Sequence, residues 1–127
     1  MSAVSSQTVE VLIVTDNFLE AADLTEAFGT TKTDSVMHLR ELHECEPFLS
    51  DTAFRPWLCI VSYQRAAAAG LAALAQSIIA RGSALVLIDA PEEDARALHA
   101  VPLARPFTHM TLSALLAQLN TADRPGA

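Results

Sequence analysis

Three short apolar segments, each followed by a helical pattern, constrain the fold of this chain more than any other feature. VEVLIV (9–14), PWLCIV (56–61) and SALVLI (83–88) are rich in Val, Ile and Leu. Strands that are buried on both faces of a parallel sheet have this continuous apolar character, whereas half-exposed strands alternate apolar and polar residues. The three segments therefore predict the central strands of a parallel sheet.

Helical patterns follow each of these strands. Residues 19–29 have apolar side chains at helical spacing and end at Gly29, and the Ala-rich segment 64–81 is followed by Gly82. Both glycines are typical helix stops. Segment 91–100 begins with a proline and three acidic residues, which suit the positive end of a helix dipole.

Two weaker strands, 34–39 and 100–104, and two helices, 40–49 and about 110–120, complete the alternation. Alternating strands and helices of this length form a parallel sheet with helices on both faces. We expect a doubly wound α/β fold of the flavodoxin-like kind, (βα)5, with strand order 2-1-3-4-5.

The chain has 127 residues, enough for one domain, which we place at 9–121. It lies between a flexible N-terminus (1–8) and a polar tail or linker (122–127) that could lead to an output domain.

The net charge of −7 argues against direct binding of nucleic acid, so we expect protein partners. The N-terminus does not resemble a secretory signal, and the longest apolar run (66–80) is too short for a membrane span, which predicts a cytoplasmic protein without membrane contact. Cys45 and Cys59 are expected to be reduced core residues.

The carboxyl ends of the expected strands bring five polar side chains to one edge of the sheet, where ligands of doubly wound folds bind. Thr15 and Asp16 follow the first strand, Ser62 ends the third, Asp89 ends the fourth and Arg105 ends the fifth. This edge is therefore the candidate functional site.

Two segments, VLIVTDN and LARPF followed by LSALLAQL, resemble a response-regulator receiver domain over nearly the whole chain. The resemblance implies a phosphoryl group on an aspartate that ends the third strand, and Mg²⁺ held by acids after the first strand. It also implies a Ser or Thr at the end of the fourth strand and a Lys at the end of the fifth, both binding phosphoryl oxygens.

Carried over residue by residue, the match fails at these positions. Thr15 replaces the first acid and only Asp16 is kept; Ser62 occupies the phosphoacceptor position, Asp89 the hydroxyl position and Arg105 the lysine position. One carboxylate and a serine supply too few oxygens for Mg²⁺, and Asp89 would repel a phosphoryl group. We expect a degenerate receiver with no metal, no cofactor and no enzymatic activity.

Arg105 is expected to turn toward Asp89, and also toward Asp16, in a charge-assisted network that holds the site without phosphate. Two simpler interpretations stay open. Asp89 could cap the helix that begins near Pro91, and Arg105 could be solvated without a partner.

Two functions are compatible with these features. The first is a phosphorylation-independent module for protein interaction in bacterial signal transduction or transcription control, forming a homodimer through the face made by 92–104 and 109–119. The candidate contact residues on this face are Glu93, Arg96, Leu98, His109, Leu112 and Leu116. The alternative is a sensor of a small ligand or anion, with Arg105, Ser62 and Thr15 as donors.

Overall fold

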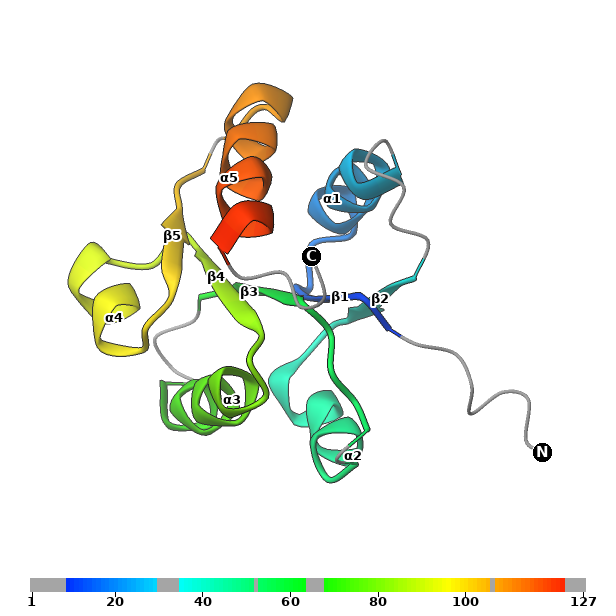
Figure 1. Cartoon of the computed structure of the whole chain (residues 1–127), viewed down its shortest axis with the longest axis vertical. Coiled ribbons are helices and arrows are strands. Elements are labelled where there is room, and N and C mark those ends of the chain that lie inside the picture. The colour runs from blue at the N-terminus through cyan, green and yellow to red at the C-terminus, as the bar shows by residue number, and fades with distance from the viewer. Residues whose placement is uncertain (1–8, 30–34, 52, 64–67, 106, 123–127) are drawn as a thin grey trace.

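A computed structural model describes residues 9–29, 35–51, 53–63, 68–105 and 107–122. The elements, shown in Figure 1, are β1 (Val11–Val14), α1 (Phe18–Gly29), β2 (Val36–Leu39), the 3-10 turn η2 (Leu42–Cys45), α2 (Glu46–Leu49), β3 (Leu58–Ser62), α3 (Ala68–Ala80), β4 (Ala84–Ile88), α4 (Glu92–Ala97), β5 (Val101–Leu103) and α5 (His109–Ala122). The predicted strands are all present.

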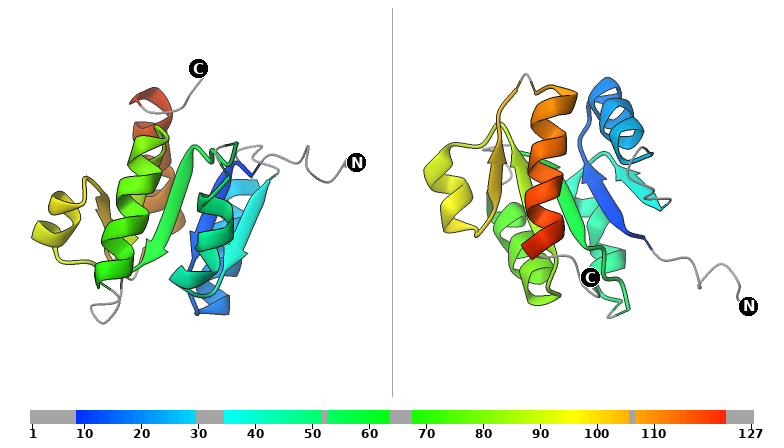
Figure 2. Two further views of the ribbon diagram at one scale, coloured as in Figure 1. Left: turned by 90° about the horizontal axis from the view of Figure 1, so that it is seen from below. Right: turned by 45° about the horizontal axis from the view of Figure 1, so that its top comes forward.

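The five strands form one parallel sheet in the order β2-β1-β3-β4-β5, which confirms the predicted flavodoxin-like topology. In the centre of the sheet Ile13 of β1 is paired with Ile60 of β3, and Ile60 with Val86 of β4. Figure 1 shows α1 and α5 on one side of the sheet and α2 and α3 on the other. In the views of Figure 2, α5 lies alongside the strands, and α2 and α3 lie in front of the sheet in the left-hand view.

Two apolar cores explain why the central strands are apolar up to Ser62, the last residue of β3. Alternate residues of β1 face opposite sides: Ile13 packs with Leu24 and Leu112 of α1 and α5, whereas Leu12 packs with Leu71 of α3. Residues of β1 and β4, and all but the last of β3, are buried. Polar side chains at these positions would be cut off from water on either face, which is costly.

Helix ends follow the expected chemistry with one exception. Gly82, at φ 80°, ends α3, and the amide of Ser83 donates to the carbonyl of Ile78, as in a Schellman motif. The helix predicted to run to residue 100 ends earlier, at Ala97, because His99 adopts the same left-handed conformation (φ 57°).

The segment 40–49 is not one helix, as predicted, but η2 followed by the four-residue α2. Pro47 lies in the first turn of α2 and lacks the amide that would continue a hydrogen-bonded helix from η2. The carboxylate of Glu44 accepts the amides of Arg40 and Glu41, at 2.8 Å each. These two hydrogen bonds cap the start of η2, and the helix that follows, α2, has only four residues.

The proposed N-terminal segment 1–8 and residues 123–127 of the proposed tail 122–127 lie outside the described residues, so these boundaries remain predictions, as does the start of the helix predicted at 64. Ala122, the first residue of that tail, is the last residue of α5. In the described part of the chain, none of the helices combines the length and the apolar character of a membrane span.

Candidate functional site

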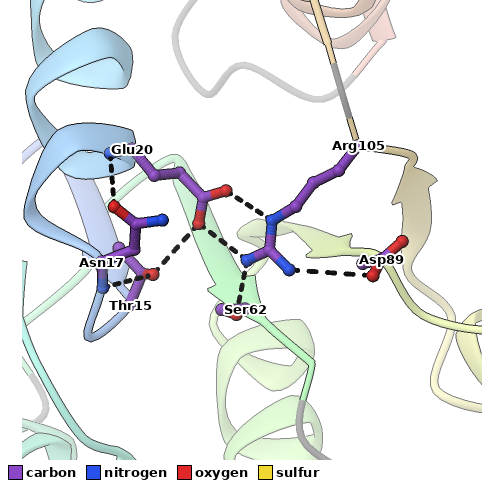
Figure 3. Close-up of polar contacts among 6 residues, drawn as sticks. All are labelled: Thr15, Asn17, Glu20, Ser62, Asp89 and Arg105. Carbon is purple, nitrogen blue, oxygen red and sulfur yellow. Dashed lines mark hydrogen bonds and ion pairs between the residues drawn. The ribbon is translucent and has the colours of Figure 1, made fainter.

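The predicted strand-end residues meet at the carboxyl edge of the sheet, as Figure 3 shows for Thr15, Ser62, Asp89 and Arg105. Thr15 directly follows β1, Ser62 is the last residue of β3 and Asp89 directly follows β4. Arg105 comes two residues after β5 and reaches back across the edge toward the other three. The parallel sheet therefore positions residues that lie far apart in the sequence.

Glu20, on the first turn of α1, is the main partner of Arg105. The Nε of Arg105 donates to Oε2 of Glu20 at 2.6 Å, and Nη2 donates to Oε1 at 2.9 Å. This is the bidentate fork that makes arginine suited to carboxylates. Nη2 also donates to Oγ of Ser62 at 2.9 Å.

The expected partners contribute less. Nη1 of Arg105 lies 3.7 Å from Oδ2 of Asp89, whose side chain is 58% exposed, so solvent screens this pair. Asp16 is exposed and acts on Arg105 through its charge alone. The predicted network exists, but its centre is Glu20, and the interpretation of Arg105 as a residue without a partner is wrong.

Glu20 is positioned by the residues around the start of α1. Its amide donates to Oδ1 of Asn17 at 3.1 Å, so Asn17 caps the helix. The amide of Asn17 donates to Oγ1 of Thr15 at 3.2 Å, and this hydroxyl donates to Oε1 of Glu20 at 3.0 Å. The spacing Asn-x-x-Glu normally indicates a capping box, in which Glu binds the amide of the cap residue. Here the amide of Asn17, the cap residue, donates to Thr15 instead, so the carboxylate of Glu20 is available to bind Arg105.

The electrostatics of the pair favour both charges. Burial by itself raises the pKa of Glu20. The hydrogen bonds from Arg105 and Thr15, together with the charge of Arg105, lower it by more than burial raises it, so the pKa of Glu20 lies below its ordinary value. The hydrogen bond to Glu20 raises the pKa of Arg105 against the opposing effect of burial, and the charges of Glu20, Asp89 and Asp16 add to the increase. The site is thus a fixed ion pair at neutral pH.

Asp89 does not cap α4. The cap position belongs to Pro91, and Asp89 instead occupies a left-handed turn at φ 62°. Asp and Asn tolerate this conformation better than most residues. The turn places the Asp89 carboxylate near Arg105 at the rim of the site.

The residues present do not fit the Mg²⁺ that the resemblance to receiver domains implies. In the part of the chain that the structure describes, no three His, Cys, Asp or Glu side chains are grouped to hold a metal ion. Glu20 uses both carboxylate oxygens on Arg105 and Thr15, and the phosphoacceptor position carries a hydroxyl, on Ser62, instead of a carboxylate. The arrangement holds the cationic side chain of Arg105 at the strand ends, between the carboxylates of Glu20 and Asp89 and the hydroxyl of Ser62.

A second polar contact joins the site to α4. The hydroxyl of Tyr63, the residue after β3, donates to Oδ2 of Asp94 on α4. Tyr63 was not singled out from the sequence, because a tyrosine after a strand has no distinctive spacing. The contact fixes α4 relative to the strand end that carries Ser62.

The predicted interface residues divide into three groups. Glu93 and Arg96 on α4 are exposed, with Leu98 half-buried beside them. Leu112 is buried against the sheet and belongs to the core, so its prediction as a contact residue is wrong. His109 and Leu116 lie on α5, but their side chains are outside the described residues.

A cleft of about 540 Å³ opens beside the site, between the end of β1, the η2–α2 segment and α3. Thr15, Asp16 and Ser62 contribute to its lining from the strand ends. The sequence did not indicate this cleft, because its lining residues come from separate segments of the chain, within 14–16, 40–49, 62 and 70–74.

Solved structures similar to this chain include receiver domains of response regulators and of a histidine kinase. The signal receiver domain of a signal transduction histidine kinase from Syntrophus aciditrophicus has a TM-score of 0.71 and 23% identity, over 94% of this chain and 96% of that one. A response regulator receiver protein from Sinorhizobium medicae has a TM-score of 0.72 and 14% identity, over 93% and 98%. An orphan response regulator from H. pylori has a TM-score of 0.67 and 17% identity, over 91% and 97%.

No family model and no curated protein matches the chain. At these identities the structural likeness shows the fold alone: this chain has the fold of receiver domains.

Proposed function

We propose that this chain is a receiver-like regulatory module of bacterial signalling that works without phosphorylation and acts by binding proteins, including a second copy of itself. The observation that carries the proposal is the fork of Arg105 on Glu20, extended to Ser62. A cation from the protein itself already links the strand ends that a phosphoryl group and Mg²⁺ would link in the resembled family. The module has a binding role and no catalytic one.

Acyl phosphate formation needs a carboxylate nucleophile and a divalent cation that neutralises the transferred group. Among the described contacts, no carboxylate that could act as a base is hydrogen-bonded to the hydroxyl of Ser62. The Oγ of Ser62 instead accepts a hydrogen bond from Arg105. Asp89 adds a negative charge at the rim of the site, which would repel phosphate. These features support a site that stays in one state.

The contact surface we propose is the α4–β5–α5 face, defined as α4, β5 and α5. It exposes both signs of charge, at Glu93 and Arg96, and a large apolar side chain, Met110, which is 83% exposed. Pro102 lies in β5, the edge strand, and has no amide to donate to another strand. Partners would therefore dock through side chains and not by extending the sheet.

The first test uses beryllofluoride with Mg²⁺, a phosphoryl mimic for receiver aspartates, and amide NMR spectra. We expect no shifts at Asp16, Ser62, Asp89 or Arg105, because Ser62 leaves the acceptor position without the carboxylate that carries the mimic. Saturable shifts at these amides would contradict phosphorylation independence.

The second part of the test is sedimentation equilibrium of the same sample. We expect a species of twice the 13.6 kDa chain mass. Met110→Glu should dissociate it, whereas Leu19→Glu, at a similarly exposed (79%) apolar residue on α1, should not. A monomer at all concentrations, or dissociation only by Leu19→Glu, would contradict the proposed face.

The alternative function, an anion sensor at the strand ends, has less support. Its main donor, Arg105, is bound to Glu20, and the neighbouring cleft contains the carboxylate of Asp16. An anion would have to displace an internal carboxylate from the arginine fork.

A further inference from the structure

The cleft between η2–α2 and α3 has the size and lining of a site for a small molecule. Its volume of about 540 Å³ lies within the range of ligand pockets in proteins, roughly 300 to 1,000 Å³. Leu42, Leu49 and Leu74 line it with apolar side chains. Gly70 of α3 leaves one wall without a side chain.

The charges around this cleft are mostly negative. Asp16, Glu41 and Glu46 contribute carboxylates, and Arg40 contributes a cation. Two of the four have partners: Glu41 pairs at 3.8 Å with His43, which also lines the cleft, and the guanidinium of Arg40 lies 5.2 Å from the centre of the Phe18 ring. Within the described residues, the carboxylates of Asp16 and Glu46 have no hydrogen bond or ion pair.

We propose that this cleft binds a small organic cation with an apolar body, such as an arylalkylamine. The apolar part would cover Leu42, Leu49 and Leu74, and the ammonium group would lie toward Asp16 and Glu46. This charge complementarity distinguishes the cleft from the anion site discussed above. The proposal does not depend on the protein-interaction function, because no residue of the α4–β5–α5 face lines the cleft.

The test compares three indoles that share one ring and differ in charge: tryptamine, indole-3-ethanol and indole-3-acetate. Binding is measured by amide NMR titration, followed at Leu42, Gly70 and Leu74. One ion pair near a protein surface predicts that tryptamine binds about threefold to tenfold more tightly than the neutral alcohol. We expect the anion to bind more weakly than either.

Two sets of variants locate the site. Gly70→Leu should fill the cleft and reduce tryptamine affinity at least about tenfold, a change of about 1.4 kcal/mol. Gly70→Ala is the matched control, because a Cβ there lies 3.9 Å from Cδ1 of Leu42, an ordinary contact that leaves the cleft open. Asp16→Asn with Glu46→Gln changes only exposed side chains and should remove the preference for the cation while the alcohol still binds.

Three results would each overturn the proposal. They are equal affinity for the three indoles, no shifts for tryptamine at about 10 mM, and unchanged tryptamine affinity in both Gly70→Leu and the charge variant. If Gly70→Leu does not fold, the charge variant decides alone.

Discussion

Removing the guanidinium of Arg105 is the most direct test of the fixed site. Arg105→Ala leaves the carboxylate of Glu20, whose side chain is 7% exposed, with the Thr15 hydroxyl as its described donor. Removing one partner of a buried pair costs about 3 to 5 kcal/mol, whereas exposed pairs contribute about 0.2 to 1 kcal/mol. The Arg105 side chain is 37% exposed, so water screens part of the interaction. We expect a loss of about 2 kcal/mol in the free energy of unfolding at pH 7.

Urea unfolding followed by circular dichroism measures this loss. A decrease of this size corresponds to about 8 °C in Tm for a domain of this length. Asp89→Asn is the control: it removes the weak partner at 3.7 Å, keeps a residue that tolerates the left-handed turn, and should cost less than about 0.5 kcal/mol.

The pH dependence follows from the direction of the Glu20 shift. Its folded pKa lies below the ordinary value of 4.5, so its stabilising contribution is complete above 4.5 and is lost as the pH falls through the lowered pKa. In Arg105→Ala, burial remains and raises the pKa of Glu20, so acid no longer removes a stabilising charge. The difference in the free energy of unfolding between the original chain and Arg105→Ala should therefore become smaller below pH 4.5.

A double-mutant cycle with Glu20→Gln identifies the partner. In the Glu20→Gln background, Arg105→Ala should cost about 1 to 2 kcal/mol less than in the original chain. A loss below about 0.5 kcal/mol for Arg105→Ala, or additive effects in the cycle, would refute the reasoning.

Two further predictions concern the elements around the site. Tyr63→Phe removes the hydrogen bond to Asp94 and should cost about 1 kcal/mol, with faster hydrogen exchange confined to α4; unchanged exchange there would show that the contact does not hold the helix. His99→Gly relieves the left-handed conformation at φ 57° and should raise the free energy of unfolding by about 0.5 to 1 kcal/mol in urea; a decrease would mean that the histidine side chain compensates for the strain.

The sequence predicts the sheet well because its central strands are buried on both faces. Ile13, Ile60 and Val86 lie in continuous apolar runs that only a covered parallel sheet accommodates. The edges of the fold are harder to predict, since Pro47 divides an expected helix and His99 shortens another.

The site was predicted in its location but not in its central partner. Strand ends identify Arg105 and Ser62 because parallel strands bring them to one edge. Glu20 escapes this reasoning because it lies inside a helix, at a position where a capping role is the simpler interpretation. Only the hydrogen bond from the Asn17 amide to Thr15, a three-dimensional detail, releases the carboxylate for Arg105.

The Glu20–Arg105 pair also has a consequence for how the chain folds during synthesis. The two residues are 85 positions apart, so a nascent chain that has produced β1, β3 and α3 still lacks the cation for Glu20. Closing so long a loop costs entropy before any contact offsets it. The pair can therefore form only after residue 105 has been synthesised. A truncated product that ends before residue 105 would have the Glu20 carboxylate without the Arg105 guanidinium as its counter-ion. We expect such a product to be less stable and therefore to be degraded faster by proteases.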